Sequence, residues 1–201
     1  MFCAEGVCQA PPRATFDELP PALFARAQTA TVRVRVERAH GGVEEATASL
    51  LINGTALDPA RETGGRLRFD VPLRLAPSGI EAKVPFDVSV LDDLGHATVL
   101  SGSLAVDDLA PRVFIDASSV PSQAVARGTV VHLRAHVFDA STVALQTSPA
   151  TALAPEMDGS FRMSVDTGAL DPTAVVAEAV LTAVDAVGLR GSASARFAVT
   201  K

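Results

Sequence analysis

The strongest constraint on the fold is an internal repeat that divides the chain near its middle. The segment 106–112 (VDDLAPR) ends one alternating apolar run and begins another, and a rougher copy of its end, QAPPR, occupies 9–13. Later segments also match, 65–69 (GRLRF) with 159–163 (GSFRM) and 90–95 (VLDDLG) with 183–188 (AVDAVG). Because these matches occur in the same order at similar spacing, they predict two homologous modules. We expect a tail over 1–10, one module over 11–108 and a second over 109–201.

Short alternating runs of apolar and polar residues fill both modules. In 31–37 (TVRVRVE) the valines lie on one side of an extended chain and the charged residues on the other, which is typical of a strand with one buried face. Gly-Gly, Asn-Gly and Asp-x-x-Gly segments interrupt the runs, as turns do. We therefore predict an all-β fold of antiparallel strands. The pattern allows one turn of helix, directly after Pro21.

The two modules differ in the size of the side chains that they bury. The rows predicted to be buried in the first module are Val32, Val34 and Val36; Ala46, Ala48, Leu50 and Ile52; Leu67, Phe69, Val71 and Leu73; Val84, Phe86, Val88 and Val90; and Leu100, Gly102, Leu104 and Val106. Those of the second are Val131, Leu133, Ala135 and Val137; Phe161, Met163 and Val165; Ala177, Ala179, Leu181 and Ala183; and Ala195, Phe197 and Val199. The second set is smaller, so we expect the second module to be the less stable one.

Composition and charge argue against several classes of function. The net charge is −6 and the cations are scattered, which argues against nucleic acid as a partner, because phosphate binding needs clustered Lys and Arg. No run of 18 apolar residues is present to span a membrane, and the first residues lack the pattern of a signal peptide. The sequence has no Trp and no Tyr, which argues against a carbohydrate-stacking platform or an aromatic binding face.

The ends of the two modules resemble a known family. Each module carries an Asp-x-x-Gly turn before its last strand, the last strand of the first module ends in Ala-Val-Asp, and Asp-x-Ala-Pro (108–111) begins the second. These features are similar to tandem bacterial immunoglobulin-like repeats, of the Big and cadherin-like kind, in surface and secreted proteins. The resemblance covers about 11–201 and implies two tandem immunoglobulin-like antiparallel β-sandwiches. The chain has neither the inter-sheet cysteine pair nor the core Trp of antibody-type domains, so it does not belong to that branch.

Acidic residues gather at the expected turns and at the junction. Asp107 and Asp108 resemble the acidic linkers of cadherins, in which calcium stiffens adjacent sandwiches, and this resemblance implies a calcium site. Calcium takes six to eight oxygen ligands and is often held by Asp in loops. The alternative is that Asp favours turns because its side chain accepts hydrogen bonds from nearby backbone amides. The other acidic residues at expected turns are Asp92, Asp93, Asp116, Asp139 and Asp185.

Cys3 and Cys8 are the only cysteines. Two cysteines cannot complete a tetrahedral zinc site by themselves. The sequence leaves three alternatives open, which are a local disulfide in an oxidising compartment, two free thiols, and a lipid-anchored cysteine.

No group of residues predicts catalysis. His132 and His136 belong to one expected strand, where about 13 Å separates them, too far to share a metal ion. We expect them at the surface, together with His40 and His96. No serine occurs in a Gly-x-Ser-x-Gly context, and the sequence has no phosphate-binding glycine loop and no recognisable pair of catalytic carboxylates. We therefore expect neither enzymatic activity nor a cofactor other than calcium.

The pattern as a whole favours a mechanical function. We expect a non-catalytic spacer of an extracellular or cell-envelope bacterial protein, with other domains of the same polypeptide or a surface assembly as partners. Pro111 restricts the backbone of the short junction and so limits bending. Because 9–13 resembles this junction, we expect another domain before residue 1. The alternative is an adhesion or recognition module that binds protein or glycan through its end loops, of which 56–65 and 147–159 are the best candidates.

Overall fold

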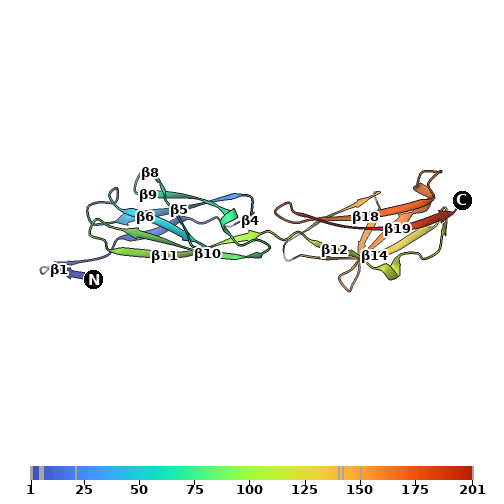
Figure 1. The fold of residues 1–201 in the computed structure, drawn as a ribbon, viewed down its shortest axis with the longest axis horizontal. Helices are drawn as coiled ribbons and strands as arrows, with labels where there is room; N and C mark the ends of the chain where they lie inside the picture. Colours follow the sequence, from blue (N-terminus) through green and yellow to red (C-terminus); the bar gives the residue numbers. More distant parts are fainter. Residues whose placement is uncertain are drawn as a thin grey trace. The chain divides into compact units, whose positions relative to one another are not determined.

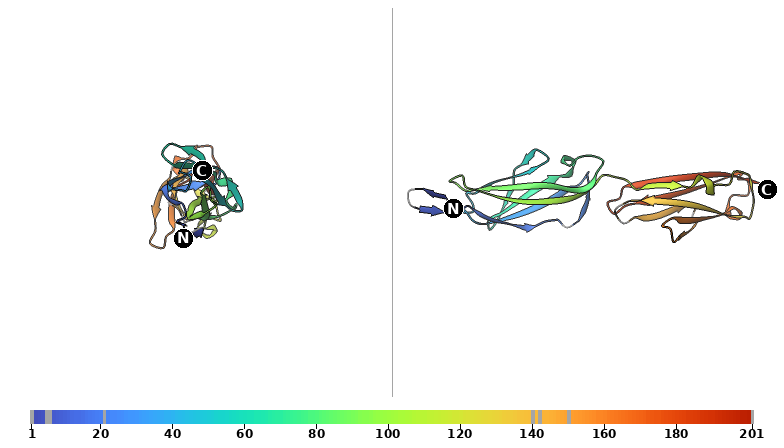
Figure 2. Two further views of the ribbon diagram at one scale, coloured as in Figure 1. Left: turned by 90° about the vertical axis from the view of Figure 1, so that its left-hand side faces the viewer. Right: turned by 90° about the horizontal axis from the view of Figure 1, so that it is seen from below.

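A computed structural model describes residues 2–4, 7–20, 22–139, 141, 143–149 and 151–200, with side chains from residue 10 onward. The chain forms two compact units, Met1–Asp108 (unit 1) and Leu109–Lys201 (unit 2). In each unit two β-sheets face each other (Figure 1, Figure 2). They enclose one hydrophobic core. The fold is thus all-β, with two tandem immunoglobulin-like sandwiches, as the sequence predicts. Within the described residues no helix is long and apolar enough to cross a membrane.

Unit 1 contains an N-terminal hairpin, β1-β2, and two sheets of the strand orders β3-β5-β9-β8 and β4-β11-β10-β6-β7. A short 3-10 helix, η1, follows β9. The bounds are β1 Phe2–Ala4, β2 Val7–Gln9, β3 Arg13–Glu18, β4 Leu23–Ala25, β5 Thr29–Arg38, β6 Thr47–Ile52, β7 Thr55–Leu57, β8 Ala60–Glu62, β9 Arg66–Pro72, η1 Leu73–Leu75, β10 Glu81–Leu91 and β11 Ala97–Asp107.

Unit 2 repeats this plan with two sheets of the orders β12-β14-β17-β16 and β13-β19-β18-β15. Two short 3-10 helices, η2 and η3, follow β12 and β17. The bounds are β12 Arg112–Ile115, η2 Ala117–Ser119, β13 Val125–Ala126, β14 Val130–Phe138, β15 Ala144–Ser148, β16 Ala152–Pro155, β17 Phe161–Asp166, η3 Thr167–Ala169, β18 Val176–Val184 and β19 Arg190–Thr200.

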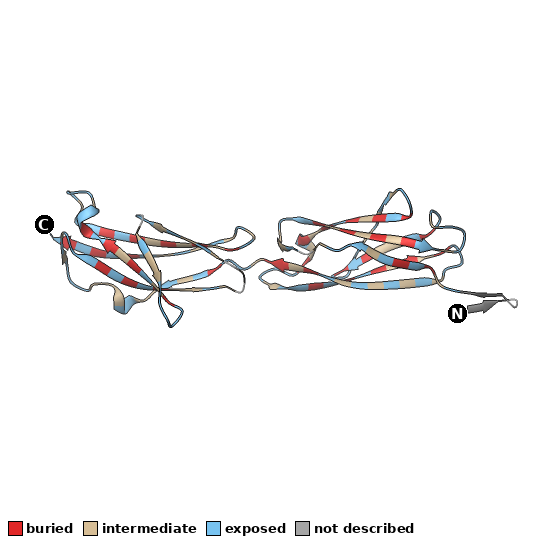
Figure 3. Ribbon diagram, turned by 180° about the vertical axis from the view of Figure 1, so that it is seen from behind, coloured by how far each residue is buried: buried red, intermediate tan, exposed pale blue. Residues whose placement is uncertain are grey.

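Buried and exposed residues alternate along the long strands (Figure 3). The predicted rows face the two cores, with Val32, Val34 and Phe69 fully buried in unit 1. Five predicted members are only half-buried. They are Ala48, Leu100, Gly102, Val137 and Phe161.

Each unit also has one parallel strand pair. Residues of β4 pair with β11, and those of β13 pair with β19, in parallel register. The helical turn allowed after Pro21 is therefore wrong, because Leu23–Ala25 forms β4. The physical reason is tertiary, since the edge of β11 supplies hydrogen-bonding partners that an isolated segment lacks.

The two loops expected to be irregular contain regular structure. The segment 56–65 includes the end of β7 and all of β8, and 147–159 includes the end of β15 and all of β16. Both β8 and β16 are edge strands of corresponding sheets. The unpaired edges of β9 and β17 stabilise these short, weakly patterned strands.

Candidate functional site

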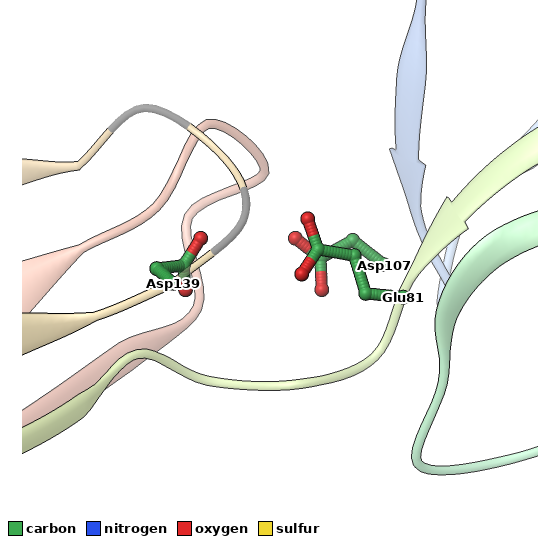
Figure 4. A group of neighbouring side chains, drawn as sticks. All are labelled: Glu81, Asp107 and Asp139. Atoms are coloured by element: carbon green, nitrogen blue, oxygen red, sulfur yellow. The ribbon is translucent and has the colours of Figure 1, made fainter.

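The residues predicted to bind calcium lie at one end of the β10–β11 hairpin in unit 1. Asp107 ends β11, Glu81 begins β10, and the two residues are directly paired in the ladder. The two side chains lie side by side (Figure 4). Their carboxylate oxygens are within 4.8 Å of each other, and Asp107 is fully buried. Two carboxylates this close repel each other when both are ionised, and a cation between them relieves that repulsion.

Asp108 has a different local role from Asp107. Its backbone N–H donates to the carbonyl of Ile80 over 2.8 Å, and its Oδ2 accepts from the N–H of Gly79 over 2.9 Å. The side chain therefore holds the turn before β10, which is the alternative that the sequence left open for acidic residues. Glu81 was not predicted, because only the register of the hairpin places it opposite Asp107.

Asp92 and Asp185 occupy the corresponding turns before the last strand of each unit. Oδ1 of Asp92 accepts from the N–H groups of Leu94 and His96 over 3.0 and 2.8 Å. Oδ1 of Asp185 accepts from the N–H groups of Val187 and Leu189, each over 2.9 Å. The repeated Asp-x-x-Gly pattern is therefore a turn device in which the carboxylate closes the loop.

Asp92 has an additional partner in the ring of His96, whose Nδ1 lies 3.1 Å from Oδ2. Burial raises the pKa of the Asp92 carboxyl, but the hydrogen bonds from His96 and Leu94 and the charge of the His96 ring outweigh burial, so this pKa lies below its ordinary value. His96 is half-buried, which corrects the expectation that it is exposed. His40 is exposed as expected, with Nδ1 2.6 Å from Oδ1 of Asp93.

The acidic residues of the remaining turns in unit 2 also bond locally. Asp116 precedes η2 and accepts from the N–H and hydroxyl of Ser118, and these bonds lower the pKa of its carboxyl. Asp139, whose side chain Figure 4 also draws, accepts from the N–H and hydroxyl of Ser141 over 2.7 and 2.6 Å. These bonds are those of Asp in ordinary turns.

The backbones of Cys3 and Cys8 face each other in the β1–β2 hairpin. Their side chains lie outside what the structure describes. The three alternatives for these cysteines stay predictions.

A second candidate site lies on the outer face of the β12-β14-β17-β16 sheet. A hollow of about 400 Å³ opens there, lined by His132, Leu133 and Arg134 of β14, Arg162 of β17, and the turn 156–158. Within it Arg134 forms an ion pair with Asp158, and Arg162 pairs with Glu156 over 3.3 Å. The turn projects the fully exposed side chain of Met157 into solvent. The sequence pointed to 147–159 as a recognition loop, but not to the sheet face beside it.

The same face carries a cluster of rings. The rings of Phe114 and Phe138 meet edge to face with centroids 6.0 Å apart, and His136 stacks on Phe138 at 6.2 Å and 9°. The guanidinium of Arg112 lies 5.5 Å from the centroid of Phe114. Phe114 and Phe138 are 46% and 59% exposed. The fold thus gathers Phe and His rings from separate strands on one exposed face.

The face does not form a hydrolytic triad. Nδ1 of His132 lies 3.0 Å from the hydroxyl of Ser164. Among the described residues no carboxylate bonds to the His132 ring, and both groups are exposed to solvent. The pair therefore lacks the group that orients and stabilises an imidazolium in serine hydrolases. His132 is exposed, as expected, whereas His136 is half-buried and stacks on Phe138.

Comparison with known proteins identifies a fold and no family. No family model and no curated protein matches the chain. A solved structure of an adhesin described as Ca²⁺-stabilised, with which an Antarctic bacterium binds ice, is 18% identical at a TM-score of 0.57, covering 95% of this chain and 49% of its own. A structure from a 1.5-MDa bacterial ice-binding adhesin is 15% identical at a TM-score of 0.56, covering 96% of this chain and 67% of its own.

This chain thus spans about half the length of the first adhesin structure. Identities this low show similarity of fold alone. The fold class is tandem immunoglobulin-like β-sandwiches.

Proposed function

We propose that the chain is a non-catalytic, load-bearing spacer of an extracellular or cell-envelope bacterial protein. The observation that carries this proposal is the parallel pairing of an early strand with the last strand in both units, β4 with β11 and β13 with β19. Tension on the two ends of a unit pulls such parallel strands in opposite directions along their length. The backbone hydrogen bonds between them are then loaded together in shear, instead of one after another. Such an arrangement resists extension.

Two further features support the spacer. Each unit buries its own core, so neither needs the other to fold. The fold resembles those of two bacterial adhesins, one of which is described in connection with retention at the host cell surface. We propose accordingly that the partners are other domains of the same polypeptide or of a surface assembly.

Force spectroscopy on the whole chain tests the spacer. We expect two separate unfolding events, one for each unit. Arg127→Pro removes the backbone N–H that donates to the carbonyl of Thr200 in β19 over 3.0 Å, directly after β13, and should lower the unfolding force of unit 2 alone. The matched control is Ala152→Pro in β16, an edge strand outside the loaded pair, which should leave that force unchanged. Extension of either unit without a force peak, or equal effects of the two variants, would falsify the proposal.

We further propose that unit 1 binds calcium through Asp107 and Glu81, with Asp108 beside them. The observation in favour is the approach of the two carboxylates to within 4.8 Å with Asp107 fully buried. One of the adhesins of similar fold is described as Ca²⁺-stabilised, which supports this choice of cation. Binding to the folded state alone stabilises that state by mass action.

The calcium proposal is tested by the melting temperature of unit 1 in calcium and in chelator. Calcium should raise it, and the rise should disappear in Asp107→Asn and Glu81→Gln. Asp92→Asn, at the opposite end of the same hairpin, is the matched control and should keep the rise. A melting temperature that is the same in calcium and in chelator contradicts this site and leaves the spacer proposal intact.

A further inference from the structure

The outer faces of the two corresponding sheets differ at one ion pair. In unit 1, Arg13 of β3 forms an ion pair with Glu37 of β5, with Nε 2.8 Å from Oε2. The pair Ala14–Val36 in unit 1 corresponds to the pair Val113–Val137 in unit 2. The residue before Ala14 is Arg13, and its counterpart is Arg112. The residue after Val36 is Glu37, and its counterpart is Phe138. Among the described residues no carboxylate pairs with Arg112, whose described contact is with the Phe114 ring. Unit 2 therefore has an arginine at the position of Arg13 but a phenylalanine in place of the carboxylate of Glu37.

Apolar rings replace the missing polar partners. Phe114 occupies the position of Thr15 in unit 1, so two substitutions in the repeat place exposed rings beside Arg112. Exposed Phe side chains forgo the gain of burial, about 25 cal/mol for each Å² of apolar area. A ligand that covers them recovers this free energy.

The ring cluster is continuous with the hollow on the same face. Every second residue of β14 points to this side, so Phe138, His136, Arg134 and His132 follow one another at about 6.6 Å intervals. Arg134 pairs with Arg162 of β17 across the ladder. The ring cluster, with the guanidinium of Arg112 beside it, is thus one apolar part of this face. The hollow is the polar part, in which arginines are hydrogen-bond donors and Glu156 and Asp158 are acceptors.

The size and polarity of this face indicate the class of ligand. A stable protein interface buries about 800 Å² on each partner around an apolar centre. The apolar part of this face consists of only two phenylalanines and a histidine, which is small for such a centre. A hollow of about 400 Å³ with a few convergent polar groups has the dimensions of a small-ligand site. The unmatched guanidinium selects an anionic group. A ligand that combines an apolar face, hydroxyl groups and a carboxylate matches these features of the face.

We propose that the outer face of the β12-β14-β17-β16 sheet binds an acidic oligosaccharide built from hexuronic acids. One sugar ring packs against the exposed surfaces of Phe114 and Phe138, whose rings are inclined to each other by 67°, and its carboxylate pairs with Arg112. The hydroxyls of the next sugar bond in the hollow to the groups of Arg134, Arg162 and Glu156. This site is independent of the spacer function and of calcium in unit 1, since it lies wholly on one sheet of unit 2.

The test is titration of the whole chain with oligogalacturonate, followed by calorimetry and by amide chemical shifts. We expect saturable binding with shifts confined to β12, β14, β17 and the turn 156–158. Phe138→Glu gives Arg112 the partner that Arg13 has in unit 1, and it should weaken binding at least tenfold. Arg112→Gln removes the cation and should cost about tenfold, the equivalent of about 1.4 kcal/mol for a charge-assisted contact. Both residues are exposed or at the strand end, so the melting temperature of unit 2 checks that the fold is retained.

Matched probes and variants separate this proposal from others. Glu37→Gln, the corresponding change in unit 1, should leave the affinity unchanged. The same oligosaccharide with its carboxylates reduced to alcohols should bind at least tenfold more weakly, and so should polyglutamate, which has carboxylates but no sugar rings. Absence of binding to oligogalacturonate overturns the proposal. Equal binding of polyglutamate also overturns it, in favour of an acidic peptide, and equal binding of the reduced sugar overturns the assigned role of Arg112.

Discussion

The sheet β3-β5-β9-β8 in unit 1 and the sheet β12-β14-β17-β16 in unit 2 share a strand order but present different outer faces. In unit 1 four arginines of β5 and β9, Arg33, Arg35, Arg66 and Arg68, form ion pairs with carboxylates. Arg33 lies between Glu18 and Glu62, with distances of 2.5 and 3.4 Å. Asp17 bridges Arg35 and Arg66 at 2.9 and 2.7 Å. In unit 2 the cations of the same sheet share their surface with exposed rings. The backbone plan therefore does not determine what a face can bind, because outward side chains change without cost to the core.

A local irregularity contributes to this difference. The register of β3 against β5 shifts between Phe16 and Glu18, so Asp17 has no direct partner in the ladder and reaches two arginines. Burial raises the pKa of the Asp17 carboxyl, but hydrogen bonds and the positive charges of Arg35 and Arg66 outweigh it, and the pKa is lowered. The corresponding chain in unit 2 turns into η2 after Asp116, and leaves β12 shorter than β3.

The two cores also differ. Most of the largest fully buried side chains lie in unit 1, among them Phe69, Leu50 and Ile52. Those of unit 2 are Leu133, Met163 and Leu181. Alanines fill much of β18, with Ala177, Ala179 and Ala183 buried there. The lower stability of unit 2 stays a prediction, and the following changes are chosen to reverse or sharpen the comparison.

The largest expected effect reverses the order of unfolding. Phe69 is fully buried at the centre of unit 1, and Phe69→Ala should destabilise that unit by about 3–5 kcal/mol through lost burial and a cavity. We expect unit 2 to unfold first in the unaltered chain and unit 1 to unfold first in the variant. Hydrogen exchange resolved by peptide measures the two units separately without Trp or Tyr as reporters. If amide exchange in β5 and β9 is still slower than in β14 after the substitution, the destabilisation of unit 1 is smaller than expected.

A smaller difference is expected between alanine substitutions at two glycines, one in the last strand of each unit. A Cβ on Gly191 of β19 would overlap the backbone carbonyl of Pro111, whereas one on Gly102 of β11 would meet only the ring end of Phe86. A side chain gives way more readily than a backbone, so Gly191→Ala should destabilise unit 2 by about 1–3 kcal/mol or more, and Gly102→Ala should cost unit 1 less. Urea unfolding of both variants measures the difference. Equal losses are the result that contradicts this account.

Acidification should act on unit 1 through Asp92. Its pKa is lowered in the folded state, so the ionised carboxyl stabilises the fold above the unfolded value of about 3.9, and that contribution is lost as the pH falls through the lowered pKa. We expect a fall in the melting temperature of unit 1 between pH 5 and pH 2 that is smaller in Asp92→Asn. Asp185→Asn, in the corresponding turn with Leu189 in place of His96, is the control and should leave the acid sensitivity of unit 1 unchanged. The same acid sensitivity in Asp92→Asn and the unaltered chain excludes this role.

The smallest effect belongs to the surface ion pair that distinguishes the two sheets. The Arg13 side chain is 71% exposed and that of Glu37 is 36% exposed, so Glu37→Gln should change the stability of unit 1 by less than about 1 kcal/mol, and less still at high salt. Thermal melts at low and high salt measure this change. A loss well above this value means that the pair stabilises the fold, and that its absence from unit 2 has an energetic cost.

The sequence predicted the parts of the fold that depend on alternation and on turns. The rows headed by Val32, Leu67 and Val84 face the core because a strand with one buried face requires a period of two. The repeated Asp-x-x-Gly segments form corresponding turns, in which Asp92 and Asp185 bond to the backbone. The strands β4, β8 and β16 were missed, because they are short and depend on the exposed edge of a neighbouring strand.

The sequence by itself determined an all-β chain in two similar halves, because alternation and turn chemistry are properties of neighbouring residues. Only the tertiary structure decided which residues from distant strands meet. It paired Glu81 with Asp107, and it placed Phe114 beside Phe138 on an outer face whose counterpart in unit 1 is charged. Strand register sets such encounters, and register depends on the packing of a whole sandwich.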